Sequence, residues 1–132
     1  TLQELEPQGD LVCVFGCGGN RDKTKRPEMG AIATKYAGRV IVTSDNPRFE
    51  DPLEIIADIK AGMDIKGKAK SLFISDRTEA IRTAILTAKP GSIILVAGKG
   101  HEDYQIIGGV KHHLDDKEII KEAFMMQKEA KN

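Results

Sequence analysis

The chain has 132 residues, which fits a single domain with one hydrophobic core, and its 20 Lys and Arg balance its 20 Asp and Glu to give a formal net charge of zero. Apolar residues make up 40% and charged residues 30%, a composition typical of a folded, soluble domain and not of a disordered chain. The balanced charge favours neither nucleic acid nor an anionic membrane as a partner, and no apolar run approaches the roughly 18 residues that a membrane span needs.

The first part of the chain alternates a short apolar run with a longer amphipathic one. Residues 11–15 (LVCVF) are continuously apolar, which predicts a strand buried on both faces. A helix is expected from Pro27, which suits a first helical turn, to Gly38, which suits a helix end. Its predicted core face consists of Met29, Ile32, Ala33 and Tyr36. Residues 39–44 (RVIVTS) predict the second strand.

The pattern then repeats twice. Asp51 and Asp76 each precede a Glu three residues later, which predicts two capped helix starts, the first with Pro52 at its first turn. Residues 71–75 predict a strand between these helices, and residues 92–97 (SIILVA) predict the fourth and most apolar strand. The apolar stripes of the two helices are Leu53, Ile56, Ile59 and Met63, and then Ile81, Ala84, Ile85 and Ala88.

The last third of the chain departs from this alternation. Residues 104–107 and 110–113 flank Gly108-Gly109, a signal for a two-residue hairpin. A final helix is expected from Asp115 or Asp116 to about Lys128. On this helix, Met125 and Met126 are expected to lie on the core face rather than in a groove for a partner.

Strict alternation of strand and helix predicts an α/β fold, with a mainly parallel sheet, helices on both faces and an antiparallel hairpin at one edge. Residues 1–132 are expected to form one domain. In such sheets, ligands bind beyond the carboxyl ends of the strands, so the segments that follow the strands are the places to search for a site.

The first such segment, residues 16–27, combines three glycines with four positive charges and one negative charge between residues 21 and 26. It is not a dinucleotide fingerprint, because Arg21 stands where the third glycine would be, and it lacks the G-K-[ST] of a phosphate-binding loop. An ordinary solvated loop could also carry this combination of glycines and charges. The density of cations beside glycines at the mouth of a parallel sheet favours an anion site.

Two further segments carry side chains suited to a charged ligand. In Asp45-Asn46-Pro47-Arg48, an ordinary turn and a site in which the Arg48 fork grips a carboxylate are equally supported. Residues 98–102 (GKGHE) follow the fourth strand, and their density of Lys, His and Glu around two glycines favours a site in which Glu102 could bind an ammonium group. For Asp76-Arg77, a structural role is favoured over a ligand contact, because capping the helix is a sufficient role for Asp76.

A metal site is not expected. The cysteines, Cys13 and Cys17, have the wrong spacing for a zinc knuckle, and His112 and His113 are neighbours in a strand and so point to opposite faces. Cys17 as a nucleophile would need His101 as its base, and a small residue in a glycine-rich turn is the simpler interpretation. Two cysteines cannot make a disulfide framework, so we expect free thiols and a cytoplasmic protein.

An arginine-rich mouth with one acid, Glu102, suits a ligand that bears carboxylates and an amine. The segments FGCGGNRDKTKRP (15–27), TSDNPR (43–48) and VAGKGHEDYQ (96–105) also resemble, in order and spacing, the C-terminal domain of the Mur ligases, and within that family the diaminopimelate-adding members. The resemblance runs from about Leu11 to the final helix. It implies a Rossmann-like domain that receives the incoming amino acid during peptidoglycan synthesis.

The resemblance also implies individual roles. Asp45, Asn46 and Arg48 match the signature for meso-diaminopimelate, which differs from lysine by the carboxylate that Arg48 would hold. Arg21 would be a second arginine that reaches the amino acid, Gly98 would contribute through its backbone, and Glu102 would meet the distal ammonium. Further contacts on the anion or nucleotide side are expected from Lys23, Lys25, Arg26, Lys99 and His101.

The family's enzymes have three domains, and the resemblance implies that this chain is one of them, truncated at its N-terminus. The absent domains would bind ATP with Mg²⁺ and UDP-N-acetylmuramoyl-L-alanyl-D-glutamate; ATP would phosphorylate the D-glutamate carboxylate, and the amine of diaminopimelate would attack the acyl phosphate. The chain alone is therefore expected to be an inactive monomer that binds no ATP or Mg²⁺. The alternative is a stand-alone, non-catalytic binding module for a small zwitterion or phosphate; a nicotinamide-dependent oxidoreductase is disfavoured by the missing third glycine.

Overall fold

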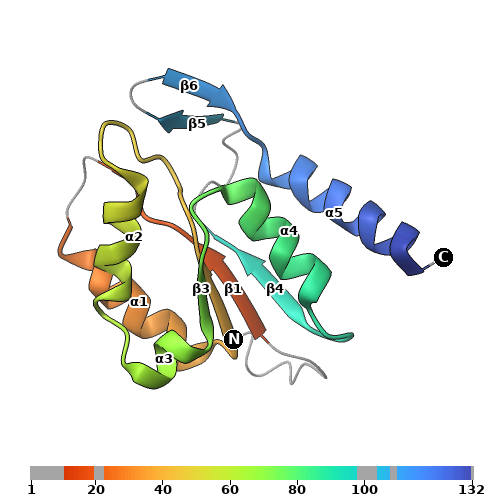
Figure 1. Ribbon diagram of the computed structural model, residues 1–132, viewed down its shortest axis with the longest axis horizontal. Coiled ribbons are helices and arrows are strands. Elements are labelled where there is room, and N and C mark those ends of the chain that lie inside the picture. The colour runs from red at the N-terminus through yellow and green to blue at the C-terminus, as the bar shows by residue number, and fades with distance from the viewer. Residues whose placement is uncertain (1–10, 20–22, 98–103, 108–109, 132) are drawn as a thin grey trace.

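The computed structural model describes residues 11–19, 23–97, 104–107 and 110–131. A central sheet lies between two groups of helices, α1 to α3 on one face and α4 with α5 on the other (Figure 1). The elements are β1 (Leu11–Phe15), α1 (Lys25–Tyr36), β2 (Arg39–Val42), α2 (Pro52–Lys60), α3 (Ile65–Ala69), β3 (Ser71–Phe73), α4 (Arg77–Thr87), β4 (Ile93–Val96), β5 (Tyr104–Ile107), β6 (Val110–His113) and α5 (Asp116–Lys131).

The four-stranded sheet has the order β3-β2-β1-β4, and each of its described pairings is parallel. β1 is therefore central, with Val12 opposite Arg39 of β2 and Leu11 opposite Ile93 of β4. The predicted three-layer α/β fold with a mainly parallel sheet is confirmed.

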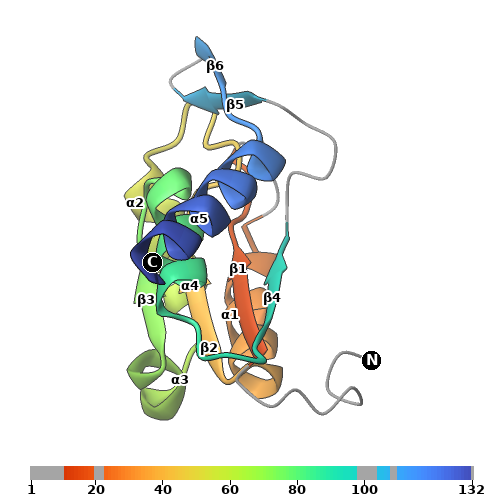
Figure 2. The same ribbon diagram turned by 90° about the vertical axis from the view of Figure 1, so that its right-hand side faces the viewer.

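The expected position of the hairpin is wrong. β5 and β6 do pair antiparallel, but in the described residues they form a separate two-stranded sheet and extend neither edge of the main one. The hairpin lies beyond the carboxyl ends of the parallel strands (Figure 2), where the Gln105 side chain donates to the Asp45 backbone oxygen at 2.7 Å. The Gly108-Gly109 turn lies outside the described residues.

Two apolar clusters hold the three layers together. On one face, Val12, Val14 and Ile41 of the sheet pack against side chains of α4 and α5. On the other face, Val40 and Val42 pack mainly against α2. The helical side chains of these clusters include Ile81, Ala84, Ile85, Ile119 and Ala123 on the first face and Ile55, Ile56 and Ile59 on the second.

The helix starts follow the sequence pattern closely. The Asp51 carboxylate accepts from the Leu53 N–H at 2.9 Å, and the Asp76 carboxylate accepts from the Glu79 N–H at 3.2 Å. Asp115 accepts in the same way from the Lys117 N–H at the start of α5, at 2.9 Å. These bonds satisfy N–H groups that have no partner within the helix, so the predicted caps are confirmed.

Most of the predicted core face of α1 is wrong, and of its four residues Ala33 packs against the apolar cluster on that side of the sheet. Met29, Ile32 and Tyr36 are 40%, 58% and 49% exposed, and an open apolar groove of about 320 Å³ runs beside Met29 and Ile32. The helix packs instead through its small residue Gly30, where a Cβ would overlap the Ile59 carbonyl oxygen of α2. Close contact between the two backbones thus takes the place of an interface between large side chains.

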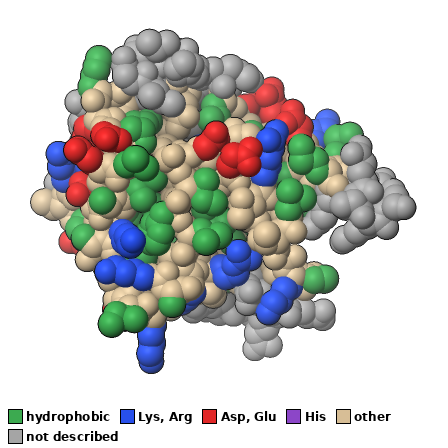
Figure 3. All heavy atoms as spheres, in the orientation of Figure 1, with side chains coloured by type: hydrophobic (Ala, Val, Ile, Leu, Met, Phe, Trp, Pro, Cys, Tyr) green, Lys and Arg blue, Asp and Glu red, His purple; other side chains and the backbone are tan. Residues whose placement is uncertain are grey.

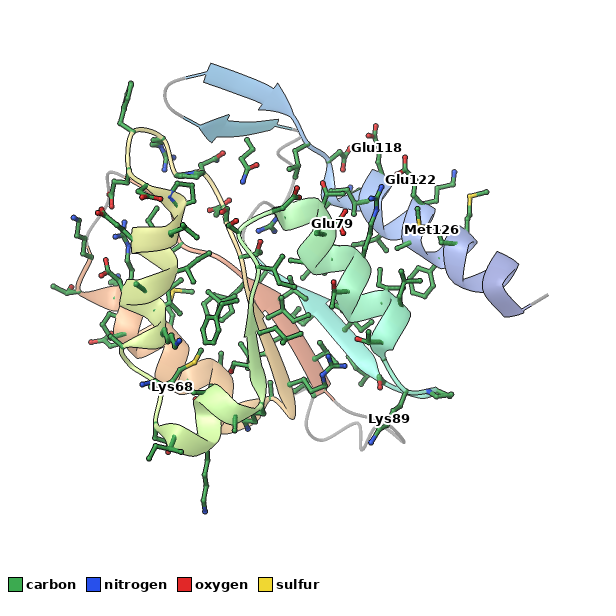
Figure 4. The ribbon with its side chains drawn as sticks, in the orientation of Figure 1. Lys68, Glu79, Lys89, Glu118, Glu122 and Met126 are labelled. Carbon is green, nitrogen blue, oxygen red and sulfur yellow. The ribbon has the colours of Figure 1, made fainter. Side chains whose placement is uncertain are left out.

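Apolar side chains in three other elements are also more exposed than the sequence pattern indicates. Leu95 of β4, the most apolar of the predicted strands, is 43% exposed, because β4 lies at an edge of the sheet. Leu53 is 63% exposed, and Ile55 is buried in α2 instead. Met125 and Met126 are 56% and 41% exposed, and Met126 projects outward from α5 (Figure 4).

The surface carries both signs of charge. On the face shown in Figure 3, acidic side chains gather in the half nearer the hairpin, and most of the Lys and Arg side chains lie farther from it. Among the described residues, no helix combines the length and the apolar character that a bilayer crossing requires.

Candidate functional site

The candidate site lies where the chain reverses its direction across the sheet. The connections from β1 to β2 to β3 proceed toward one edge, and the next strand, β4, lies on the other side of β1. Segments that follow β1 and β4 therefore diverge at the carboxyl ends of these strands, where ligands of open α/β sheets bind. Several predicted site residues lie outside the described residues, namely Arg21, Gly98, Lys99, His101 and Glu102.

The segments after β1 and β2 are in direct backbone contact. The Gly19 N–H donates to the Asn46 carbonyl oxygen at 2.6 Å, and a Cβ on Gly19 would overlap the carbonyl group of Pro47. Asn46 is 3% exposed. Glycine at position 19 is thus required by the packing of one loop on the other, whereas the sequence pattern had associated the glycines of this loop with an anion site.

Arg48 has a fixed conformation in this contact. Its φ of 57° lies in the left-handed region, which is unfavourable for a residue with a side chain. The guanidinium Nη1 donates to the Gly19 oxygen at 2.9 Å and to the Asn46 oxygen at 3.2 Å. In the described part of the chain these contacts use Nη1, so the edge formed by Nε and Nη2 is the one that a planar carboxylate could approach.

Arg26, a predicted anion contact, is held by the protein's own carboxylates. It is 1% exposed; its two terminal nitrogens donate to both Glu50 oxygens, each at 3.1 Å, and Nη1 also donates to Asp58 at 2.9 Å. Burial alone would lower the pKa of Arg26, but the hydrogen bonds and charges of Glu50 and Asp58 outweigh it and raise that pKa.

Arg26 therefore connects three parts of the structure. The side chain contacts carboxylates on α2 and in the segment just before α2. Its Nη2 also donates to the Gly18 carbonyl oxygen at 3.1 Å, so the side chain ties the loop after β1 to α2. Lys23 and Lys25 are exposed near the same loop, and Lys23 Nζ is 3.8 Å from Glu50. An anion contact of these two lysines stays a prediction.

Two residues that help to position the site, Gln105 and Glu50, were not recognised from the sequence, and for Arg77 the sequence indicated only a place beside a helix cap. Gln105 is 5% exposed and holds the backbone of Asp45 from the hairpin, Glu50 orients Arg26, and Arg77 bonds to the ends of two strands. The Arg77-Asp116 pair is 39 residues apart in sequence, so no local pattern could have indicated it.

Cys17 offers a way to test the electrostatics of the site. Burial raises the pKa of the Cys17 thiol, nearby Arg26 lowers it and Asp45 raises it, with a net rise. We expect Asp45→Asn to lower the pKa of Cys17, so that more thiolate is present at pH 8 and alkylation by iodoacetamide is faster. The Cys13 thiol, whose raised pKa has burial as its cause, serves as the internal control. Peptide mass spectrometry would resolve the two rates; equal acceleration at both thiols would indicate loosening of the structure instead.

Taken together, the described groups suit recognition rather than bond chemistry. They offer one positioned guanidinium at Arg48, the buried amide of Asn46 and the Asp45 carboxylate beyond the carboxyl end of β2. Such groups can hold a small molecule that bears a carboxylate and an amine.

The chain was compared with protein families and with known proteins. Residues 1–100 match the family described as "Mur ligase, glutamate ligase domain". The chain is 59% identical to the UDP-N-acetylmuramoyl-L-alanyl-D-glutamate–2,6-diaminopimelate ligase of Bacteroides fragilis over 92% of its own length, and 61% identical to that of Bacteroides thetaiotaomicron over 91%. In each case it spans only 25% of the relative's length.

A solved structure gives the same result. The chain resembles a structure of a UDP-N-acetylmuramoyl-L-alanyl-D-glutamate–2,6-diaminopimelate ligase with a TM-score of 0.87 and 45% sequence identity, over 96% of this chain and 27% of that one. Because the family match covers most of the chain, and the similarity extends to the arrangement of its helices and strands, this protein belongs to the Mur ligase family and contains its glutamate ligase domain.

Proposed function

We propose that this chain is the domain of a diaminopimelate-adding ligase that binds meso-diaminopimelate and presents its amine to UDP-N-acetylmuramoyl-L-alanyl-D-glutamate. The observation that carries the proposal is Arg48, whose guanidinium is anchored through Nη1 at the carboxyl end of the sheet. The names of the relatives, which share 59% and 61% of the matched sequence, support this substrate.

The charges of the two candidate amino acids explain the choice between them. Diaminopimelate and lysine share one amino-acid group, and diaminopimelate adds a carboxylate beside its second amine. Arg48 would pair with that carboxylate, and binding lysine would leave the guanidinium without this partner. A site built around a charged contact rejects a ligand that lacks it by a factor of about 10⁴.

The remaining contacts belong to predicted residues. Asp45 and Asn46 would bind the same end of the substrate as Arg48, and Arg21, Gly98 and Glu102 would complete the site, with Glu102 facing the distal ammonium.

The described part of the glycine-rich loop after β1 does not have the form of an ATP-binding loop. In the glycine-rich loop after β1, the Gly19 N–H bonds to Asn46 and the Gly18 oxygen accepts from Arg26, so these groups hold the loop together and are not directed at phosphates. ATP and Mg²⁺ are therefore assigned to other domains of a complete protein, as is the UDP-linked substrate. This chain's part is to bind and orient the amine, and amide formation then takes place on the carboxyl group that those domains activate.

The test is a competition between amino acids in the complete protein. With UDP-N-acetylmuramoyl-L-alanyl-D-glutamate and ATP present, we expect kcat/KM for meso-diaminopimelate to exceed that for L-lysine by about 10³- to 10⁴-fold. Mass spectrometry of the product identifies the amino acid that was added. Equal use of lysine would refute the substrate assignment, and the absence of any ligated product would favour a non-catalytic binding module.

A further inference from the structure

Arg77, the first residue of α4, is buried at the carboxyl end of the sheet. Its side chain is 0% exposed. Nε donates to Asp116 Oδ1 at 2.8 Å, and Nη2 donates to Asp116 Oδ2 at 2.7 Å. Two parallel hydrogen bonds of this kind fix both the position and the plane of a guanidinium, and Asp116 is itself fixed as the first residue of α5.

The remaining contacts of Arg77 join two strands that do not pair with each other. Nη1 donates to the Ser44 carbonyl oxygen at 2.9 Å, just beyond β2, and Nη2 donates to the Ala97 carbonyl oxygen at 3.1 Å, directly after β4. In the sheet, β1 lies between these strands. One side chain therefore spans the end of β1 and ties together strand ends that are about 10 Å apart.

These two carbonyl groups immediately precede the segments with the predicted ligand contacts. Ser44 directly precedes Asp45, the first residue of the Asp45–Arg48 segment, in the sequence. Ala97 directly precedes Gly98, which lies outside the described residues. We propose that Arg77, oriented by Asp116, is a positioning residue that fixes the distance between the start of the Asp45–Arg48 segment and Ala97, directly after β4, and thereby the affinity for the amino-acid substrate.

Stability alone gives a weaker account of the same contacts. A buried ion pair contributes little more than apolar side chains of the same volume would, and α4 already packs on α5 through Ile81, Ile85 and Ile119. Apolar side chains at positions 77 and 116 could not bond to the carbonyl groups of Ser44 and Ala97. The Arg77-Asp116 pair therefore does something that apolar packing cannot do: it holds the ends of β2 and β4 at a fixed distance from each other.

Because this role serves the proposed function, the test begins with the complete wild-type protein. Arg77→Lys keeps the charge but lacks the planar fork, and Asp116→Asn is a milder change that removes the charge of the partner. For both variants we expect KM for meso-diaminopimelate to rise about 10- to 100-fold, with kcat and the KM values for ATP and the UDP-linked substrate changed by less than about twofold. The double variant should be no worse than Arg77→Lys, since both changes act through one contact.

Two control variants separate positioning from stability. Arg82→Lys alters another arginine of α4, whose ion pairs are with Glu79 at 3.1 Å and Glu122 of α5 at 3.8 Å; both acids project from helices and not from a strand end (Figure 4). Ile81→Val removes one buried methyl group and lowers the melting temperature without removing a hydrogen bond to a strand end. Neither should raise KM for diaminopimelate.

The outcomes distinguish this role from the proposed function. If the wild-type protein does not add diaminopimelate, the proposed function fails. If the wild type adds it but Asp116→Asn and any folded Arg77→Lys protein lower only the melting temperature, as Ile81→Val does, the positioning role is refuted. A rise in KM for all three substrates together would also refute it.

Discussion

Replacing Arg48 by alanine in the complete protein is expected to lower kcat/KM for meso-diaminopimelate about 100-fold, because a carboxylate that loses its paired guanidinium loses about 3 kcal/mol. The value for L-lysine should change by about twofold or less, since lysine has no carboxylate at that end. The variant's preference for diaminopimelate over lysine would therefore fall about 100-fold. Kinetics with each amino acid in turn measures the effect.

A matched control and a second substitution sharpen this result. Arg39→Ala removes the same charge from the opposite end of β2, where Arg39 bonds to Thr87, and should leave the preference intact. Arg48→Gly should lose diaminopimelate to the same degree as Arg48→Ala. It should melt at a higher temperature than Arg48→Ala, however, because glycine accepts the φ of 57° without the strain of about 1 kcal/mol that alanine retains. A similar loss with lysine would contradict the role given to Arg48.

The second large effect is expected on stability, from Arg26→Ala. Removing a buried arginine leaves Glu50, which is 15% exposed, without its main partner, and such a loss costs about 3–5 kcal/mol. Lys23→Ala removes an exposed cation, 3.8 Å from the same carboxylate, and should cost less than about 1 kcal/mol. Amide hydrogen exchange in α1 and α2 of the complete protein would report the local stability of this region.

A double variant tests the physical cause of that loss. If the cost of Arg26→Ala comes from a stranded buried charge, adding Glu50→Gln should recover part of the lost protection, since the uncompensated carboxylate is then gone. Equal losses for Arg26→Ala and Lys23→Ala would show that the network behaves as a surface ion pair.

Features that depend on neighbouring residues could be predicted from the sequence. The parallel strands, and the caps at Asp51 and Asp76, follow from patterns that span a few positions, and the structure has them. The close relation of the segments after β1 and β2 also followed, because parallel strands place their carboxyl ends at the same edge.

Features that depend on the choice between distant partners could not be predicted. The apolar stripe that contains Met29 and Ile32 reads as a core face, yet α1 packs through Gly30, because the Ile59 backbone comes too close for a larger residue. Arg26 looks like its cationic neighbours, and only the position of Glu50 and Asp58 distinguishes it from them. β4 has the most apolar sequence and lies at the edge, since strand order is set by the crossover and not by hydropathy.

The strand order has a consequence for how the domain acquires its native state. The pairing of β1 with β2 joins residues about 27 positions apart, whereas its pairing with β4 joins residues about 80 positions apart. Contacts of such long sequence separation form late and slowly, because more chain entropy is lost before they are made. The Arg77 contact with Ala97 depends on that last pairing, so competence to bind the amino acid should appear at the end of folding and can be used to monitor its completion.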